Sequence, residues 1–149
     1  IASEPVRNLA TVGGNLVNAS PIGDPAIIIL ALHSDVVLRR GAATRILPMK
    51  DFFKAYKELN KDVNEVVDGL SFDLPKEKRV LHFNFEKVSK RNRLDIASVN
   101  TAIALELEDG VIRKAGPDIE TAAIGCPEWS KTIAATHLTP VSISSLSTA

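Results

Sequence analysis

A proline followed by four consecutive charged residues interrupts the sequence near its midpoint. Pro75 precedes the run Lys76 to Arg79, which reads KEKR. Proline has no backbone N–H to give to a sheet, and adjacent charges are costly to remove from water, so this stretch favours a solvated connection. We therefore predict two structural units, residues 1–75 and residues 80–149, and the apolar residues suffice for one compact core or two small ones.

The charge balance excludes several classes of function. The 149 residues contain 18 Lys and Arg against 18 Asp and Glu, so the formal net charge is zero. A dedicated binder of nucleic acid or of anionic membranes needs a positive field that survives salt screening. No apolar run approaches the roughly 20 residues of a membrane-spanning helix. We expect neither a nucleic-acid partner nor a membrane span.

Cysteine and histidine are too sparse to define a metal site or a disulfide framework. Cys126 is the single cysteine, the three histidines are scattered, and no nucleophile–base arrangement is evident. We therefore expect a reducing, cytoplasmic location and no catalytic or metal-binding residue. The chain begins at Ile1 instead of Met and lacks a signal-peptide pattern, which predicts a segment of a longer protein.

The first unit is predicted to combine one helix with short strands. Residues 1–24 are rich in Gly, Asn, Ser and Pro and predict loops. Asp24 would then cap a helix that begins at Pro25 and continues through residues 26–32. Three further elements are expected, namely a hairpin of residues 36–38 and 45–47, an amphipathic turn or helix at 51–59, and a strand at 64–74.

The second unit is predicted to begin as antiparallel sheet. Residues 82–87 alternate in polarity, and residues 99–107 and 111–115 flank Asp109-Gly110, a dipeptide typical of tight hairpin turns. The final 20 residues are rich in Ser and Thr without periodicity and predict no defined structure. The two units together indicate the α+β class.

The stretch most suggestive of a ligand is Thr11 to Asn15, which reads TVGGN. Paired glycines can adopt positive φ and expose consecutive backbone N–H groups as a nest, which favours phosphate. Asn18 and Ser20 would add neutral polar groups, and the helix start at Asp24 would add positive dipole character. From the glycines alone, a plain tight turn is the alternative.

The longer string from Val6 to Asp24 is much more specific than the glycine pair. It resembles, without a gap, the pattern V-R-N-x-A-T-V-G-G-N-x-x-x-A-S-P-x-x-D of the molybdenum hydroxylase flavoproteins. These are the xanthine dehydrogenase, carbon-monoxide dehydrogenase medium-subunit and 4-hydroxybenzoyl-CoA reductase families. Residues 85–99 resemble the block F-x-K-x-x-x-R-x-x-x-D-I-A-x-V, which opens the C-terminal domain of these proteins. The resemblance covers roughly residues 1–115.

The resemblance implies the fold and a set of FAD-binding residues. Residues 1–75 would form the second subdomain of a PCMH-type, vanillyl-alcohol-oxidase-like FAD-binding domain, and residues 80–149 the small α+β CO-dehydrogenase flavoprotein C-terminal domain. The loop at 11–15 would contact phosphate and ribose, Val67 the isoalloxazine, and Lys87 the polar edge of the ring. The implied cofactor-binding set is Ile1, Thr11, Val12, Gly13, Gly14, Asn15, Asn18, Gly23, Asp24, Val67 and Lys87.

From the residues alone, two members of this set also have simpler interpretations. Asp24 fits a helix cap, a role that is compatible with a ligand contact because a carboxylate can do both. Lys87 on an alternating strand fits an ordinary solvated side chain.

The function implied by the resemblance is electron relay in an FAD-dependent oxidoreductase of the xanthine dehydrogenase type. Partner subunits would be a large one with molybdopterin and a small one with 2Fe-2S clusters, and FAD would pass electrons to NAD or another acceptor. Two alternatives stay open. One is a non-catalytic assembly module that binds no flavin by itself, because the family's earlier Gly-rich loop would precede Ile1. The other is a generic α+β domain that binds a phosphate ligand.

Overall fold

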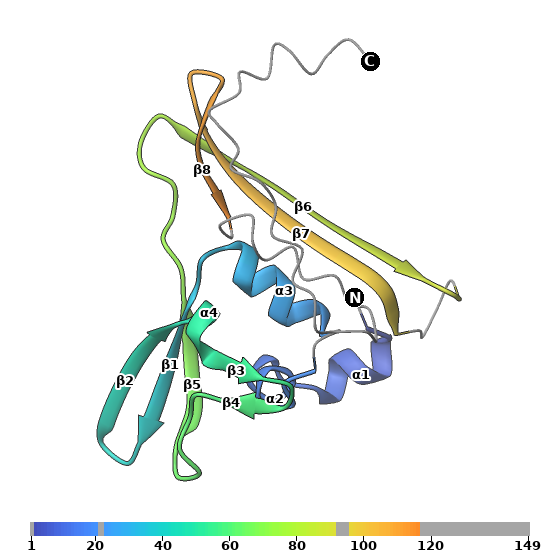
Figure 1. Ribbon diagram of the computed structural model, residues 1–149, viewed down its shortest axis with the longest axis vertical. Helices are drawn as coiled ribbons and strands as arrows, with labels where there is room; N and C mark the ends of the chain where they lie inside the picture. Colours follow the sequence, from blue (N-terminus) through green and yellow to red (C-terminus); the bar gives the residue numbers. More distant parts are fainter. Residues whose placement is uncertain (1, 21–22, 92–95, 117–149) are drawn as a thin grey trace.

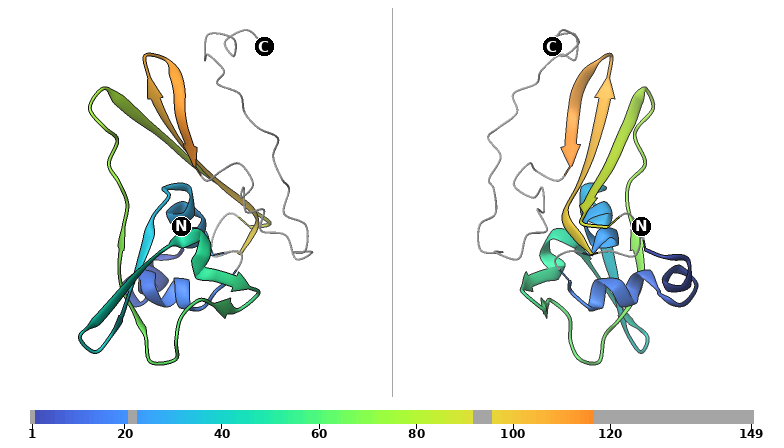
Figure 2. Two further views of the ribbon diagram at one scale, coloured as in Figure 1. Left: turned by 60° about the vertical axis from the view of Figure 1, so that its left-hand side comes forward. Right: turned by 90° about the vertical axis from the view of Figure 1, so that its right-hand side faces the viewer.

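Helix α3 (Asp24–Ala31) lies between two three-stranded sheets, as Figures 1 and 2 show. The computed structural model describes residues 2–20, 23–91 and 96–116. The helix reads DPAIIILA, with Pro25 in the first turn, where its missing N–H costs nothing. A helix that is apolar on nearly every side is stable only when several sides are packed, and both sheets supply such a surface.

The first sheet is antiparallel with strand order β2-β1-β5. It contains β1 (Asp35–Arg40), β2 (Ala43–Pro48) and β5 (Val66–Ser71). Gly41 takes φ 60 in the β1–β2 turn, a conformation that costs glycine nothing. The buried residues of this core are Leu16, Ala26, Val36, Leu38, Leu47, Met49 and Phe52, and Ile29 and Leu30 of α3 pack against them.

The second sheet is antiparallel with order β6-β7-β8, and its long first two strands run across α3 (Figure 1). The strands are β6 (Arg79–Ser89), β7 (Ala97–Glu108) and β8 (Val111–Gly116). Ala102 and Ala104 of β7 pack against Ile27 and Ala31 of α3. One helix therefore contributes to both apolar clusters, because Ile29 and Leu30 pack in the first cluster and Ile27 and Ala31 lie in the second.

The two predicted hairpins are confirmed, and the presence of both helices and antiparallel sheets agrees with the α+β class. In the β7–β8 turn Asp109 has φ 51 and Gly110 has φ 76, as the tight turn predicted for this dipeptide requires. The predicted strand at 64–74 is present but shorter, because β5 ends at Ser71. The expectations for Ile1, Cys126 and the final 20 residues lie outside the described residues.

Three local predictions are wrong. The predicted loop at 1–24 contains the short helices α1 (Glu4–Leu9) and α2 (Val12–Val17). The cap of α3 is Gly23, so Asp24 is the first helical residue and makes its contacts elsewhere. In place of the amphipathic turn or helix predicted at 51–59, α4 (Met49–Phe52) leads into the hairpin of β3 (Phe53–Ala55) and β4 (Glu58–Leu59).

A physical reason accounts for the last difference. Apolar residues at helical spacing are also compatible with a short hairpin, since the paired Phe53 and Leu59 pack against the core of the first sheet and Tyr56 is exposed at the turn. Lys57 adopts φ 60 there, which ends any helix.

Candidate functional site

The TVGGN segment is the start of helix α2 and not a positive-φ nest. Among the described glycines only Gly41 and Gly110 have positive φ, so the expectation of a left-handed glycine pair is wrong. Thr11 is the N-cap, and its Oγ1 accepts a hydrogen bond of 3.0 Å from Gly14 N–H. The N–H groups of the first helical turn have no intrahelical acceptor, so Val12 and Gly13 can still present donors at this end.

The neighbours that an added Cβ would meet, rather than φ, distinguish the two glycines of this helix. A Cβ at Gly13 would lie 3.7 Å from Val67 Cβ, so α2 approaches β5 closely at the predicted ring-contacting residue. A Cβ at Gly14 would lie 2.8 Å from Thr11 Oγ1 and would displace the cap. The structure thus brings Gly13 beside Val67 and Thr11 beside Gly14.

Asn15 and Gly23 meet where α2 faces the start of α3. A Cβ at Gly23 would lie 3.1 Å from Asn15 Oδ1, and Gly23 N–H is bonded to Ser20 O. Asn15 Oδ1 is buried and has no hydrogen-bond partner within the part of the chain that the structure describes. A buried acceptor without a donor is costly, which indicates a place for a hydroxyl or N–H of a ligand.

Asn18 lies at the opposite end of α2, where it is the C-cap. Lys57, from the β3–β4 turn, donates to Asn18 O at 2.6 Å and to Asn18 Oδ1 at 3.0 Å. This contact places a cation at a helix C-terminus, where the dipole favours it. Asn18 therefore stands apart from the Thr11–Gly14 end of the same helix.

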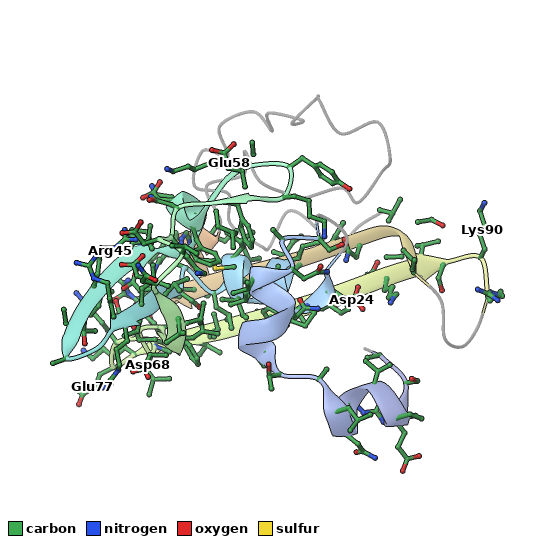
Figure 3. The ribbon with its side chains drawn as sticks, turned by 90° about the horizontal axis from the view of Figure 1, so that it is seen from below. Asp24, Arg45, Glu58, Asp68, Glu77 and Lys90 are labelled. Carbon is green, nitrogen blue, oxygen red and sulfur yellow. The ribbon has the colours of Figure 1, made fainter. Side chains whose placement is uncertain are left out.

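Asp24 joins α3 to the second sheet. Its Oδ2 accepts a 2.8 Å hydrogen bond from Lys87 Nζ of β6, and its Oδ1 accepts a 3.0 Å hydrogen bond from Asn100 Nδ2 of β7. Figure 3 shows Asp24 in the interior, where α3 meets the long strands. Two residues predicted separately, Asp24 and Lys87, are thus in direct contact.

Asn100 is the polar residue that sequence reasoning missed. It is completely buried on β7, and it is the register partner of Lys87. The feature that could have indicated it is a polar amide within the otherwise largely apolar strand sequence ASVNTAIALELE. In the sheet this amide lies opposite Lys87, which the sequence had already singled out.

The predicted residues therefore form a chain of neighbours with two exceptions. Thr11, Val12, Gly13 and Gly14 begin α2 beside Val67, Asn15 connects α2 to Gly23, and Asp24 follows Gly23 and contacts Lys87. Asn18 is directed to Lys57, and Ile1 is not described. The arrangement offers backbone donors, an apolar side chain, an unpaired acceptor and a cation, which suits an extended polar ligand with an apolar ring.

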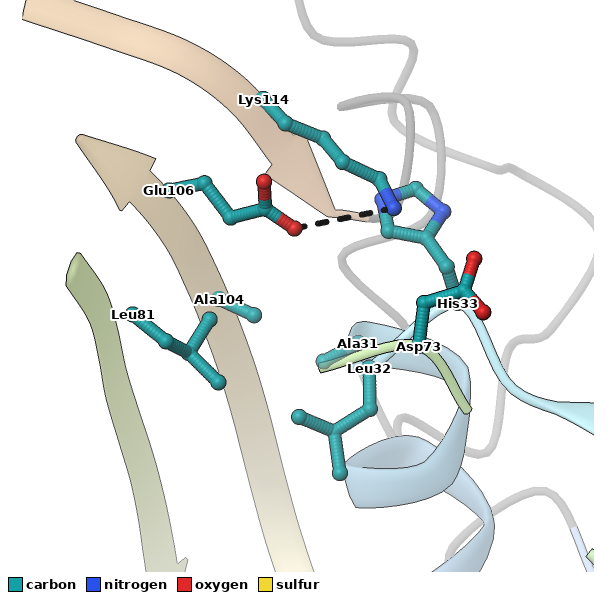
Figure 4. A pocket seen from close by; sticks show the side chains of 8 residues that line it. All are labelled: Ala31, Leu32, His33, Asp73, Leu81, Ala104, Glu106 and Lys114. Carbon is teal, nitrogen blue, oxygen red and sulfur yellow. Dashed lines mark ion pairs between the residues drawn. The ribbon is translucent and has the colours of Figure 1, made fainter. Parts of the chain in front are cut away.

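A small pocket elsewhere contains none of the predicted residues. It lies at the C-terminal end of α3, where His33, Asp73, Glu106 and Lys114 contribute its polar lining (Figure 4). Lys114 Nζ is 3.9 Å from Glu106 Oε1, and His33 Nε2 is 3.3 Å from Ala115 O. Lys114 and Glu106 are paired with each other and His33 contacts a backbone carbonyl, so the pocket is a weaker candidate for a ligand site.

Among the described residues, the largest shift in pKa belongs to a surface ion pair. Arg45 of β2 contacts Glu65 through Nε–Oε1 at 3.1 Å and Nη2–Oε2 at 2.8 Å. Hydrogen bonding from Arg45 lowers the pKa of Glu65 to about 2. Arg45 lies on the β1–β2 hairpin, well separated from Asp24 in Figure 3. This pair therefore stabilises the first sheet and does not belong to the candidate site.

Within the described residues, no three His, Cys, Asp or Glu side chains are grouped so that they could hold a metal ion. The helices of the same part of the chain are all too short or too polar to cross a membrane.

Comparison with protein families gives one match. Residues 1–76 match the family described as the FAD binding domain in molybdopterin dehydrogenase.

Curated proteins with related sequences include dehydrogenases. Xanthine dehydrogenase 1 of Arabidopsis thaliana is 33% identical over 109 residues, which are 72% of this chain and 8% of that protein. The nicotinate dehydrogenase FAD-subunit of Eubacterium barkeri is 30% identical over 112 residues, 73% of this chain and 37% of that subunit. The chain thus spans much less than half the length of these relatives.

Solved structures share the fold. Carbon monoxide dehydrogenase from Hydrogenophaga pseudoflava aligns with a TM-score of 0.69 at 23% identity, over 77% of this chain and 39% of that one. Quinoline 2-oxidoreductase from Pseudomonas putida 86 aligns with a TM-score of 0.66 at 25% identity and the same coverage.

Proposed function

Because this chain belongs to the family of FAD-binding domains of molybdopterin dehydrogenases, we propose that it forms part of the FAD site in an oxidoreductase of the molybdenum hydroxylase type. Residues 1–75 would be the second half of the FAD-binding domain and residues 80–149 the small C-terminal domain. The protein would work in the cytoplasm with a molybdopterin subunit and a 2Fe-2S subunit. Both kinds of relative, xanthine and nicotinate dehydrogenases, support this class of function.

The described residues fit the parts of FAD. Backbone N–H groups at Val12 and Gly13 suit the pyrophosphate, which seeks donors at a helix start. Asn15 Oδ1 suits a ribityl or ribose hydroxyl, because it is a buried acceptor that lacks a donor among the described residues. Val67 offers an apolar contact for the ring, and Lys87 offers a cation for its polar edge.

The unpaired Asn15 oxygen is the single observation that carries the proposal. Every other contact at this place has a structural explanation, such as the cap that Thr11 makes for Gly14. A buried acceptor without a partner costs about 1–3 kcal/mol, and a ligand hydroxyl would remove that cost.

The protein would supply position and electrostatics and not the redox chemistry. FAD held by these residues would supply the electron-transfer chemistry, with NAD or another molecule as the proposed acceptor. Asn15 would orient the cofactor chain, α2 would hold the phosphates, and Lys87 would place positive charge beside the ring. No base or nucleophile is required from these residues.

A second candidate, an assembly module that binds no flavin alone, rests on the exposure of α1. This helix buries none of its side chains among the described residues, and Leu9 is 89% exposed. An apolar surface of this kind is suited to contact with another segment or subunit.

Replacement of Gly13 by alanine separates these possibilities. A Cβ at this position meets Val67 at an ordinary contact distance of 3.7 Å, and alanine favours a helix, so Gly13→Ala should fold at least as stably. If phosphate and ring lie against α2 and β5, the methyl group should weaken FAD binding about tenfold or more. Visible flavin absorbance of the purified full-length protein and FAD titration measure this.

Two results would count against the cofactor role. Colourless wild-type protein that takes up no added FAD would favour the assembly module. Unchanged FAD affinity in folded Gly13→Ala protein would remove α2 from the site.

A further inference from the structure

Lys87 and Asn100 approach Asp24 as a cross-strand pair. They are directly opposite in the β6–β7 ladder, so their side chains leave the same face of the sheet. That face meets the first turn of α3, and each residue donates to a different oxygen of the Asp24 carboxylate. The position of the carboxylate is thus fixed from both strands.

Access to solvent increases along this network. Asn100 is 0% exposed, the Asp24 side chain 8% and the Lys87 side chain 23%. A ligand therefore reaches the lysine ammonium first and the amide last. Because an ammonium has three N–H donors and Asp24 takes one, Lys87 retains donors for a ligand.

Fold stability alone does not account for an amide at position 100. Asn100 Nδ2 is used, but its Oδ1 is buried and has no partner among the described residues. An apolar side chain at this position would avoid that unpaired oxygen. What the amide contributes is a neutral donor to Asp24, which adds no second cation to compete with Lys87.

We propose that Asn100 is a positioning residue of the cofactor site, which holds the Asp24 carboxylate and thereby directs the Lys87 ammonium towards the ligand. The identity of that ligand as FAD rests on the proposed function. The contacts among the three side chains do not depend on it.

The first test uses cofactor-free protein. In a double-mutant cycle of Asn100→Leu and Asp24→Ala, the two substitutions should be coupled about tenfold in the unfolding equilibrium constant, because each removes the same hydrogen bond. Asn84→Leu is the matched control, since Asn84 lies exposed on β6 and contacts Glu86 instead of Asp24. It should show no coupling to Asp24→Ala.

The second test uses the full-length protein with FAD. Asn100→Leu should raise the FAD dissociation constant about tenfold and lower the midpoint potential of the bound flavin. Without the amide, Lys87 alone balances Asp24, so less positive charge faces the reduced and more anionic ring. Each tenfold loss of preference for reduced flavin corresponds to about 30 mV in a two-electron couple.

Asn100→Ser, which retains a donor, should recover part of both effects. Asn84→Leu should change neither the dissociation constant nor the potential.

Three outcomes would contradict the proposal in different ways. An uncoupled cycle would show that Asn100 does not hold Asp24. A coupled cycle with wild-type FAD affinity and potential in Asn100→Leu would leave Asn100 a structural residue only. Failure of the wild type and of Asn84→Leu to bind FAD would overturn the proposed function, and the cofactor role of Asn100 with it, while the cycle still reports on the Asp24 contact.

Discussion

Gly23 shows how closely the candidate site is packed at the level of single atoms. As the cap of α3 it stands between Asn15 and the backbone of the preceding loop, and a Cβ would lie 3.1 Å from both Asn15 Oδ1 and Ser20 O. Both distances are shorter than ordinary carbon–oxygen contacts, and a backbone oxygen cannot move aside as a side chain can. The absence of a side chain at this position is therefore a packing requirement.

We predict that Gly23→Ala destabilises the protein by about 1–2 kcal/mol, because alanine is a poor N-cap and its methyl group crowds Asn15. Gly69→Ala is the matched control. A Cβ at Gly69 meets nothing within 4 Å, so alanine there should be neutral or stabilising by up to about 1 kcal/mol. Urea unfolding at equilibrium measures both, and equal midpoints for the two variants would contradict the assignment.

Sequence reasoning was most limited at this scale. It marked Asp24 and Lys87 through a family pattern, yet it did not connect them, because their contact depends on how α3 sits against a strand 63 positions later. Asn100 could be found only from the strand register that pairs it with Lys87. The roles implied for the eleven predicted residues stay predictions.

At the scale of single elements, the sequence predicts hairpins better than the short helices. The β7–β8 hairpin follows from the local requirement for positive φ at Asp109 and Gly110. Helix α2 was not foreseen because two adjacent glycines are poor helix formers. The Thr11 cap and close packing on β5 override that preference, and both depend on the tertiary structure.

The Arg45–Glu65 pair makes the stability of the first sheet dependent on pH. Glu65 has a pKa near 4.5 when unfolded and about 2 when folded, because Arg45 hydrogen-bonds its ionised form. A depressed pKa stabilises the fold fully above the unfolded value, and this contribution is lost as the pH falls from about 4.5 towards 2.

We therefore expect the stability difference between wild type and Glu65→Gln to shrink across that pH interval, because both side chains are then neutral. Chemical denaturation at several pH values measures it. Asp68→Asn, which removes the separate pair of Asp68 with Arg39, controls for the general effect of losing a surface carboxylate. A difference that stays constant down to pH 2 would show that Glu65 is not held by Arg45.

At the scale of the whole molecule, one helix links the two sheets. The predicted break at Pro75 to Arg79 lies in the connection between β5 and β6 except for Arg79, which begins β6, but α3 packs against the sheets on both sides of it. Sequence periodicity cannot reveal this, because an all-round apolar helix does not indicate which of its sides meets which sheet. The division into residues 1–75 and 80–149 stays a prediction.

We predict that Ala102→Leu destabilises the protein by about 1–3 kcal/mol, since Ala102 is 4% exposed against α3 and a larger side chain must push the helix away. Because Asp24 moves with α3, FAD affinity should fall as well. Ile103→Leu, on the half-exposed opposite face of β7, should change stability by less than about 0.5 kcal/mol. Calorimetry and FAD titration compare the two, and similar behaviour would argue against α3 docking through these alanines.

The ladder that pairs Lys87 with Asn100 makes the site sensitive to odd and even changes in strand length. Successive side chains of a strand point to opposite faces, so one residue inserted into β7 between Asn100 and Glu108 would leave one of the two facing outward. Two inserted residues would restore the facing but shift the pairing by about 7 Å along the strand. A substitution on these strands can weaken the network gradually, whereas an insertion of an odd number of residues turns a side chain to the other face of the sheet. Relatives that keep the network should therefore differ in length in the loops and not in the strands.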